Sequence, residues 1–143
     1  MFEHTNWLAV LVSALAMQAL GFLVYNPKTF GTIWMKGGKI DPNSTKTGHM
    51  ALIMGLSFVM TLVLGAYLST WVHPDEHLSQ FMHGAFHGFM LSIFLIVPVI
   101  IMNALYEQKG IGYILVNCGY AMAGLALQGG ILFMWPAAEV AVH

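Results

Sequence analysis

Charged residues are scarce in this chain of 143 residues: Asp, Glu, Lys and Arg together make up 8% of it, against about 25% in an ordinary soluble domain. So few charges could not keep the surface of a water-soluble domain hydrated and free of large apolar patches. Because 58% of the residues are hydrophobic, the simpler interpretation is one domain solvated by a lipid bilayer. Residues 1–143 are therefore predicted to form a single transmembrane domain.

Arginine is absent, cysteine occurs once, and the formal net charge is −1. Without a basic patch the chain cannot hold a nucleic-acid backbone, so nucleic acid is excluded as a partner. Cys118 cannot form an internal disulfide and lies in an apolar run, where a thiol behaves as a small hydrophobe. No positive region precedes the first apolar segment, only Glu3 and His4, so this segment is expected to be retained rather than cleaved as a signal peptide.

Four apolar segments approach or exceed the roughly 20 residues needed to cross about 30 Å of hydrocarbon. They cover residues 7–25, 47–72, 78–106 and 112–135. Pro27 and Pro136 stop the first and the last, whereas Pro98 lies inside the third and predicts a kink. Tryptophan or tyrosine lies near the segment ends, as the membrane interface favours. The pattern predicts an all-α membrane protein, with four spans in a compact antiparallel bundle.

The link between the first two spans is amphipathic. Phe30, Ile33 and Trp34 lie between Lys28 and Lys36, which predicts a short helix lying on the membrane surface.

Lysine placement predicts the orientation, because short loops rich in Lys or Arg stay in the cytoplasm. Lys28, Lys36, Lys39 and Lys46 precede the second span, and Lys109 lies between the third and fourth. Both termini and the second loop carry none. We expect a protein of the bacterial inner (cytoplasmic) membrane with both termini in the periplasm.

Six of the seven histidines then fall on the periplasmic side. His83 and His87 are four residues apart on the third span and share a helix face, while His73 and His77 lie in or beside the second loop. Imidazoles of this kind bind zinc or copper, and a helical pair such as His83 and His87 can also ligate a tetrapyrrole. The alternative is that they are ordinary interfacial residues, since the His-Glu-x-x-His pattern is absent.

Eleven methionines could suggest copper handling, because thioethers are good ligands for Cu(I). They lie mainly in the apolar segments without a concentrated Met-x-x-Met run, so packing in the helix bundle is the favoured interpretation.

Polar and small residues recur at helical spacing inside the spans. An amide in hydrocarbon is costly without a partner, and a Gly-x-x-x-Gly pair lets two helices approach closely. These residues are predicted to seal helix contacts: Gln18, Ser57, Thr61, Asn117, Gly124 and Gln128, with the pair Gly84 and Gly88. No Asp, Glu, Lys or Arg occupies the middle of a span, so the usual mark of an ion or proton pathway is missing.

Three motifs resemble a known family: Asn6-Trp7-Leu8-Ala9-Val10, Tyr25-x-Pro27-x-x-Phe30-Gly31-x-x-Trp34-Met35, and Asn117-x-Gly119-Tyr120 continuing through Gly130 to Trp135. The chain is similar over almost its whole length to small bacterial four-helix membrane proteins catalogued as a domain of unknown function. The resemblance implies the fold and implies no activity. The pair His83 and His87 is not part of the family's pattern.

The sequence leaves three functional hypotheses. The first is a non-enzymatic accessory or scaffold subunit that packs against a larger membrane complex or against copies of itself, since no nucleophile triad or phosphate loop is present. The second is a metal- or tetrapyrrole-binding protein that uses the periplasmic histidines. The third is a small transporter, against which the lack of broken helices argues.

Overall fold

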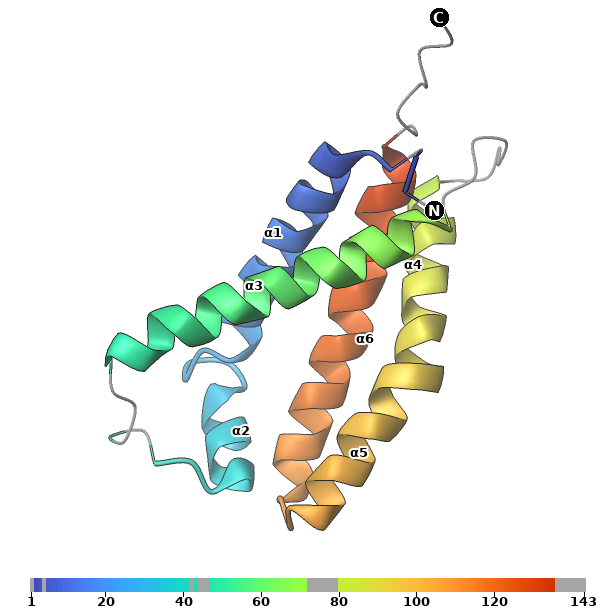
Figure 1. Cartoon of the computed structure of the whole chain (residues 1–143). Helices are drawn as coiled ribbons and strands as arrows, with labels where there is room; N and C mark the ends of the chain where they lie inside the picture. Colours follow the sequence, from blue (N-terminus) through green and yellow to red (C-terminus); the bar gives the residue numbers. More distant parts are fainter. Residues whose placement is uncertain (1, 4, 42, 44–46, 72–79, 136–143) are drawn as a thin grey trace, which may run out of the picture.

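Helices make up most of the part of the chain that the structure describes. The computed structural model describes residues 2–3, 5–41, 43, 47–71 and 80–135. Its helices are α1 Trp7–Val24, α2 Gly31–Gly38, α3 Thr47–Ser69, α4 Gln80–Leu91, the π-helix η1 Ser92–Ile96, α5 Val97–Tyr106 and α6 Ile111–Met134 (Figure 1). Four stretches are long and apolar enough to cross a membrane: Trp7–Val24, Met50–Ser69, Gln80–Tyr106 and Ile111–Met134. The predicted all-α membrane fold with four spans is therefore confirmed.

The first span begins at a side-chain cap. The Asn6 side-chain oxygen accepts hydrogen bonds from the backbone N–H groups of Leu8 and Ala9, at 3.1 and 3.2 Å. These bonds satisfy two of the donors that a helix start leaves without an intrahelical partner. The helix ends at Val24, three residues before Pro27.

The third span continues through its proline by changing its hydrogen-bond pattern. Pro98 has no N–H to donate and crowds the preceding turn. Immediately before it the chain forms η1, where Val97 N–H donates to the carbonyl of Ser92, five residues back. Figure 1 shows α4 and α5 inclined to each other on either side of this π turn. Such single-turn π segments are frequent at functional sites.

α6 is the centre of the bundle. In an apolar stretch of 18 residues within Ile111–Met134, 44% are buried inside the protein, against 17% in such a stretch of Met50–Ser69 of α3. α1, α2, α3, α4 and α5 all pack against α6. A side chain positioned by α6 can therefore meet residues from several parts of the chain.

The closest helix contact joins α4 to α6 through glycines. A Cβ atom on Gly84 would overlap the carbonyl oxygen of Gly129, and one on Gly88 would overlap that of Leu125. The two backbones thus touch directly. In a membrane this matters because lipid supplies no hydrophobic drive between helices, so close van der Waals packing must hold them together. On the other side of α6, Gly124 faces the side chain of Met17 from α1.

Side-chain amides join α3 to its neighbours. Gln18 Nε2 of α1 donates to Ser57 Oγ at 3.2 Å, and Gln128 Nε2 of α6 donates to the carbonyl oxygen of Thr61 at 2.8 Å. Gln128 is completely buried. The NH₂ group of each amide thus makes a hydrogen bond between helices, which offsets part of its cost in hydrocarbon, while Gln128 Oε1 has no partner among the described residues.

α2 packs against the beginning of α6. The Trp34 ring stacks on Tyr113 with centroids 6.0 Å apart. Gly110 N–H donates to Gly37 O at 2.7 Å, and Lys109 Nζ donates to Gly38 O at 3.0 Å. The predicted short helix after the first span is confirmed, and these contacts fix it to the end of the bundle that carries the lysines.

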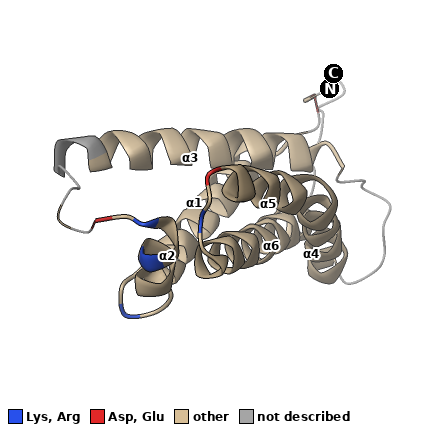
Figure 2. Ribbon diagram, turned by 90° about the horizontal axis from the view of Figure 1, so that it is seen from below, with Lys and Arg blue, Asp and Glu red and all other residues tan. Residues whose placement is uncertain are grey.

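α3 departs from the other spans. In Figure 1 it crosses α1 and α6 at a steep inclination, and in Figure 2 it lies along one side of the molecule. Its second half is packed, with Leu68 fully buried, but its first half is exposed and a Cβ on Gly55 would meet nothing within 4 Å. Antiparallel packing of all four spans stays a prediction, because α3 diverges from the others.

The glycine contact predicts a large effect of one substitution. Replacing Gly88 by Leu forces a side chain into the carbonyl of Leu125, so we expect the free energy of unfolding to fall by about 1–3 kcal/mol or more. Thermal unfolding in detergent micelles measures this. The matched control is Gly55→Leu, which has open space and should leave the midpoint unchanged or slightly higher. Equal midpoints for the two variants would contradict the packing.

Candidate functional site

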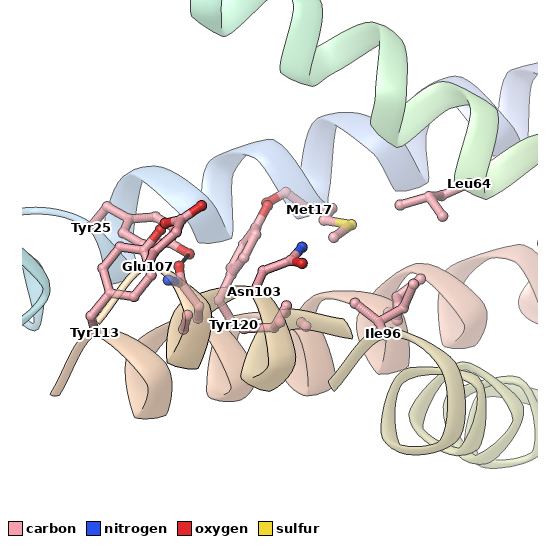
Figure 3. Close-up of a pocket in the computed structure, with 13 residues that line it drawn as sticks. Met17, Tyr25, Leu64, Ile96, Asn103, Glu107, Tyr113 and Tyr120 are labelled. Atoms are coloured by element: carbon pink, nitrogen blue, oxygen red, sulfur yellow. Dashed lines mark hydrogen bonds between the residues drawn. The ribbon is translucent and has the colours of Figure 1, made fainter. Parts of the chain in front are cut away.

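A cavity of about 360 Å³ lies between α1, α3, α5 and α6. Its walls are formed by Met17, Tyr25, Leu64, Ile96, Ile100, Asn103, Ala104, Glu107, Tyr113, Asn117, Tyr120, Ala121 and Leu125. Figure 3 shows its two unlike ends: Tyr25, Tyr113 and Glu107 gather at one, and Leu64 and Ile96 lie at the other. From α3 the cavity is lined by Leu64 alone, in the second half of that helix.

One face of the third span forms the outer wall. Ile96, Ile100, Asn103 and Glu107 recur at helical spacing and so point the same way. The first two are apolar and the last two polar. Asn103 is exposed, and its side-chain amide makes no hydrogen bond with another described residue. An amide at the edge of a membrane cavity needs water, a lipid headgroup or a ligand to satisfy it.

The inner wall, formed by α1 and α6, is held by two tyrosine hydroxyls. Tyr25 OH donates to Asn117 Oδ1 at 2.6 Å, and Tyr120 OH donates to the carbonyl oxygen of Met17 at 3.3 Å. Because Tyr25 occupies the oxygen of the Asn117 amide, the NH₂ group of that amide is the part left to serve a ligand as a donor.

Four aromatic rings surround the polar end. Tyr25 meets Trp34 edge to face at 5.0 Å between centroids and Tyr120 at 5.2 Å, and Trp34 stacks on Tyr113. Rings in these geometries add to each other's packing and form rigid walls. α2 therefore supports the cavity from outside, although only the three tyrosines line it.

Glu107 is the one charged residue among those that line the cavity. Its side chain is 57% exposed, and its carboxylate lies 4.0 Å from Lys109 Nζ. That ammonium already donates to Gly38 O and lies 5.7 Å from the centre of the Tyr113 ring. Figure 2, seen from the end that carries the lysines, shows them around α2 and the α5–α6 turn. The polar end of the cavity is thus the lysine-bearing end of the bundle.

The cavity extends along the spans. Ile96 precedes Glu107 by 11 residues, which corresponds to about 16 Å along a helix. That is roughly half the hydrocarbon thickness of a bilayer. With the lysines at the membrane surface, the cavity leads from the interface toward the middle of the membrane, and its lining changes from polar to apolar over that depth.

The predicted histidine pair lies at the other end of the bundle. His83 and His87 point their Nε2 atoms at each other, 2.8 Å apart. The His87 ring stacks on Phe133 at 5.7 Å and meets Trp71 edge-on at 5.9 Å. The pair is thus hydrogen-bonded and packed between Trp71, two residues after α3, and Phe133 of α6.

The geometry of the His83–His87 pair has different consequences for a metal ion and for a tetrapyrrole. Within the residues that the structure describes, no group of three or more His, Cys, Asp or Glu could hold a metal ion. Two nitrogens bound to one tetrahedral zinc would lie about 3.3 Å apart, farther than these two. The predicted ligands His73 and His77 lie outside the described residues, so the metal site stays a prediction. As an axial ligand, a histidine would have to turn its Nε2 away from its neighbour.

Sequence reasoning did not identify the cavity. It assigned Gln18, Ser57, Thr61, Gly124 and Gln128 to helix contacts, and all five lie at such contacts. Asn117 was placed in the same group, but it also lines the cavity. Asn103, Glu107 and Tyr120 were missed. The available signal was the periodic face of the third span, whose polar members come at the end that is followed by Lys109.

Taken together, the four apolar spans and the mixed cavity define a small four-span membrane protein. The chain belongs to the family described as "Protein of unknown function (DUF1761)", whose model matches residues 8–133. This agrees with the resemblance seen in the sequence motifs. No curated protein and no solved structure matches the chain.

Proposed function

We propose that this protein binds one amphiphilic molecule of the membrane in the cavity between α1, α3, α5 and α6, as a binding protein and not as a catalyst. The observation that carries the proposal is the gradient along the cavity, from Glu107 and Asn103 at the lysine end to Ile96 and Leu64 deeper in the bundle. A lipid has this order of polarity when its head lies at the interface and its chain points inward.

The volume of the cavity fits the polar head of an amphiphile and the first part of its apolar chain. A volume of about 360 Å³ lies in the range of ligand pockets but is too small for a whole phospholipid. The remainder of a chain would extend past Leu64 and Ile96, at the apolar end of the cavity, into the bilayer. A molecule could therefore enter sideways from the membrane.

The exposed side-chain amide of Asn103 also supports a bound molecule with a polar head. Asn103 belongs to a membrane span, and an amide facing hydrocarbon alone would be costly. A polar head in the cavity would supply its hydrogen bonds. The amide NH₂ groups of Gln18 and Gln128, by contrast, already donate to acceptors on α3.

Filling the cavity should displace the ligand. Ile100→Trp places a ring in the cavity, whereas its neighbour Val99 is exposed and does not line the cavity, so Val99→Trp is the matched control. Native mass spectrometry after mild solubilisation should show one bound amphiphile on the unmodified protein and on the Val99 variant, and none on the Ile100 variant. Equal retention by the two variants, or none by the unmodified protein, would rule out the cavity as the binding site.

We also propose the bacterial inner membrane, with both termini in the periplasm. The support is the gathering of Lys28, Lys36, Lys39 and Lys109 at one end of the bundle, with the start of α1 and the end of α6 at the other (Figures 1 and 2). Reporters active only in the periplasm, fused to either terminus, should both be active. An inactive reporter at either end would refute this orientation.

The accessory or scaffold role expected from the sequence stays a second proposal. The exposed first half of α3 is the surface where a partner helix could pack. Blue-native electrophoresis tests it, and migration as a single protomer of 15.7 kDa would speak against it.

A further inference from the structure

The polar end of the cavity selects for a charge of one sign. Resting on the proposed function, we infer that the head of the bound amphiphile carries an ammonium group, held between the Glu107 carboxylate and the rings of Tyr113, Tyr25 and Tyr120. The ligand class is thus an amine or alkylammonium on an apolar body.

The charge of the lining supports a cation. Glu107 is the one charged group among the lining residues, so the formal charge of the wall is negative. The faces of aromatic rings are also negative, and ammonium groups bind over them, most strongly when water is excluded. Three tyrosines and one carboxylate at one end of an otherwise apolar cavity combine both kinds of attraction.

Lys109 does not reverse this preference. Its Nζ donates to Gly38 O at 3.0 Å and lies 4.0 Å from the Glu107 carboxylate, at the distance limit of an ion pair. Lys109 does not line the cavity. A ligand ammonium inside the cavity can therefore approach the Glu107 carboxylate from the cavity side, while Lys109 Nζ stays hydrogen-bonded to Gly38 O.

An anionic head fits poorly at the same place. It would face the Glu107 carboxylate with no lining cation to compensate, and like charges repel strongly at short range. The donors available to it are the amides of Asn103 and Asn117. A phosphate attached to the ammonium fits better, because it could extend outward toward Lys28, Lys36 and Lys39 around α2.

Two sources share this chemistry: an aminophospholipid of the bilayer, and a free lipophilic amine dissolved in it. Identification of the molecule that co-purifies from native membranes distinguishes them. Either source supports the inference. A co-purified lipid without an amine, bound in the cavity, would overturn it.

The direct test compares two probes of equal chain length. The protein is placed in nanodiscs of digalactosyldiacylglycerol, an uncharged lipid without an amine, and dodecylammonium or dodecanol is titrated while tryptophan fluorescence is followed, since Trp34 stacks on Tyr113. We expect dodecylammonium to bind about tenfold or more tightly than dodecanol. Glu107→Gln should abolish the difference, and Glu3→Gln, at the opposite end of the bundle, should preserve it. Thermal unfolding of each variant verifies that it is folded.

The outcomes separate the two proposals. If both probes bind equally and Ile100→Trp abolishes both, the amphiphile site stands and the ammonium inference is overturned. If a folded Glu107→Gln variant keeps the preference, the inference is also overturned. If neither probe binds to the unmodified protein, the ammonium inference and the proposed function both fail.

Discussion

The direct contact between the α4 and α6 backbones is the constraint on which the rest of the structure depends. Gly84 and Gly88 let the third span approach α6 until no side chain separates them. Helices in lipid are held by such close packing rather than by exclusion of water. Because α6 also receives α1 and α2, little of its surface remains for α3, which crosses the bundle steeply and covers it only with its second half (Figure 1). α3 contributes one lining residue to the cavity, Leu64 of its second half, so α1, α5 and α6 form most of the wall.

Polar residues within the spans then fall into two groups. Those at helix contacts donate to another helix: Gln128 Nε2 donates to the backbone of α3, although its buried Oε1 has no partner among the described residues. Those at the cavity are bonded less completely: Tyr25 uses the oxygen of Asn117, and the side-chain amide of Asn103 makes no hydrogen bond with another described residue. In a membrane an amide without a partner is costly, so the second group marks a place where something from outside the fold completes the hydrogen bonding.

Much of the fold could be predicted from the sequence, since span length, proline positions and aromatic ends are local signals. Residues suited to helix contacts could also be named, because a Gly-x-x-x-Gly pair permits close approach of two helices and an amide in a span needs a hydrogen-bond partner. The cavity could not, because it depends on the inclination of α3 and on the π turn before Pro98, which brings Asn103 and Glu107 to the same side as Tyr113. The histidines show the opposite limit: their spacing put His83 and His87 on one face, yet spacing alone could not reveal that the two rings bond to each other.

A structure determined in lipid nanodiscs made from the native membrane would test the account most directly. We predict that the first half of α3 stays apart from α5 and that elongated density fills the cavity, with its compact end between Glu107 and Tyr113 and its tail beside Ile96. A structure in which α3 packs along α5 and closes the cavity, with no density between them, would contradict the account.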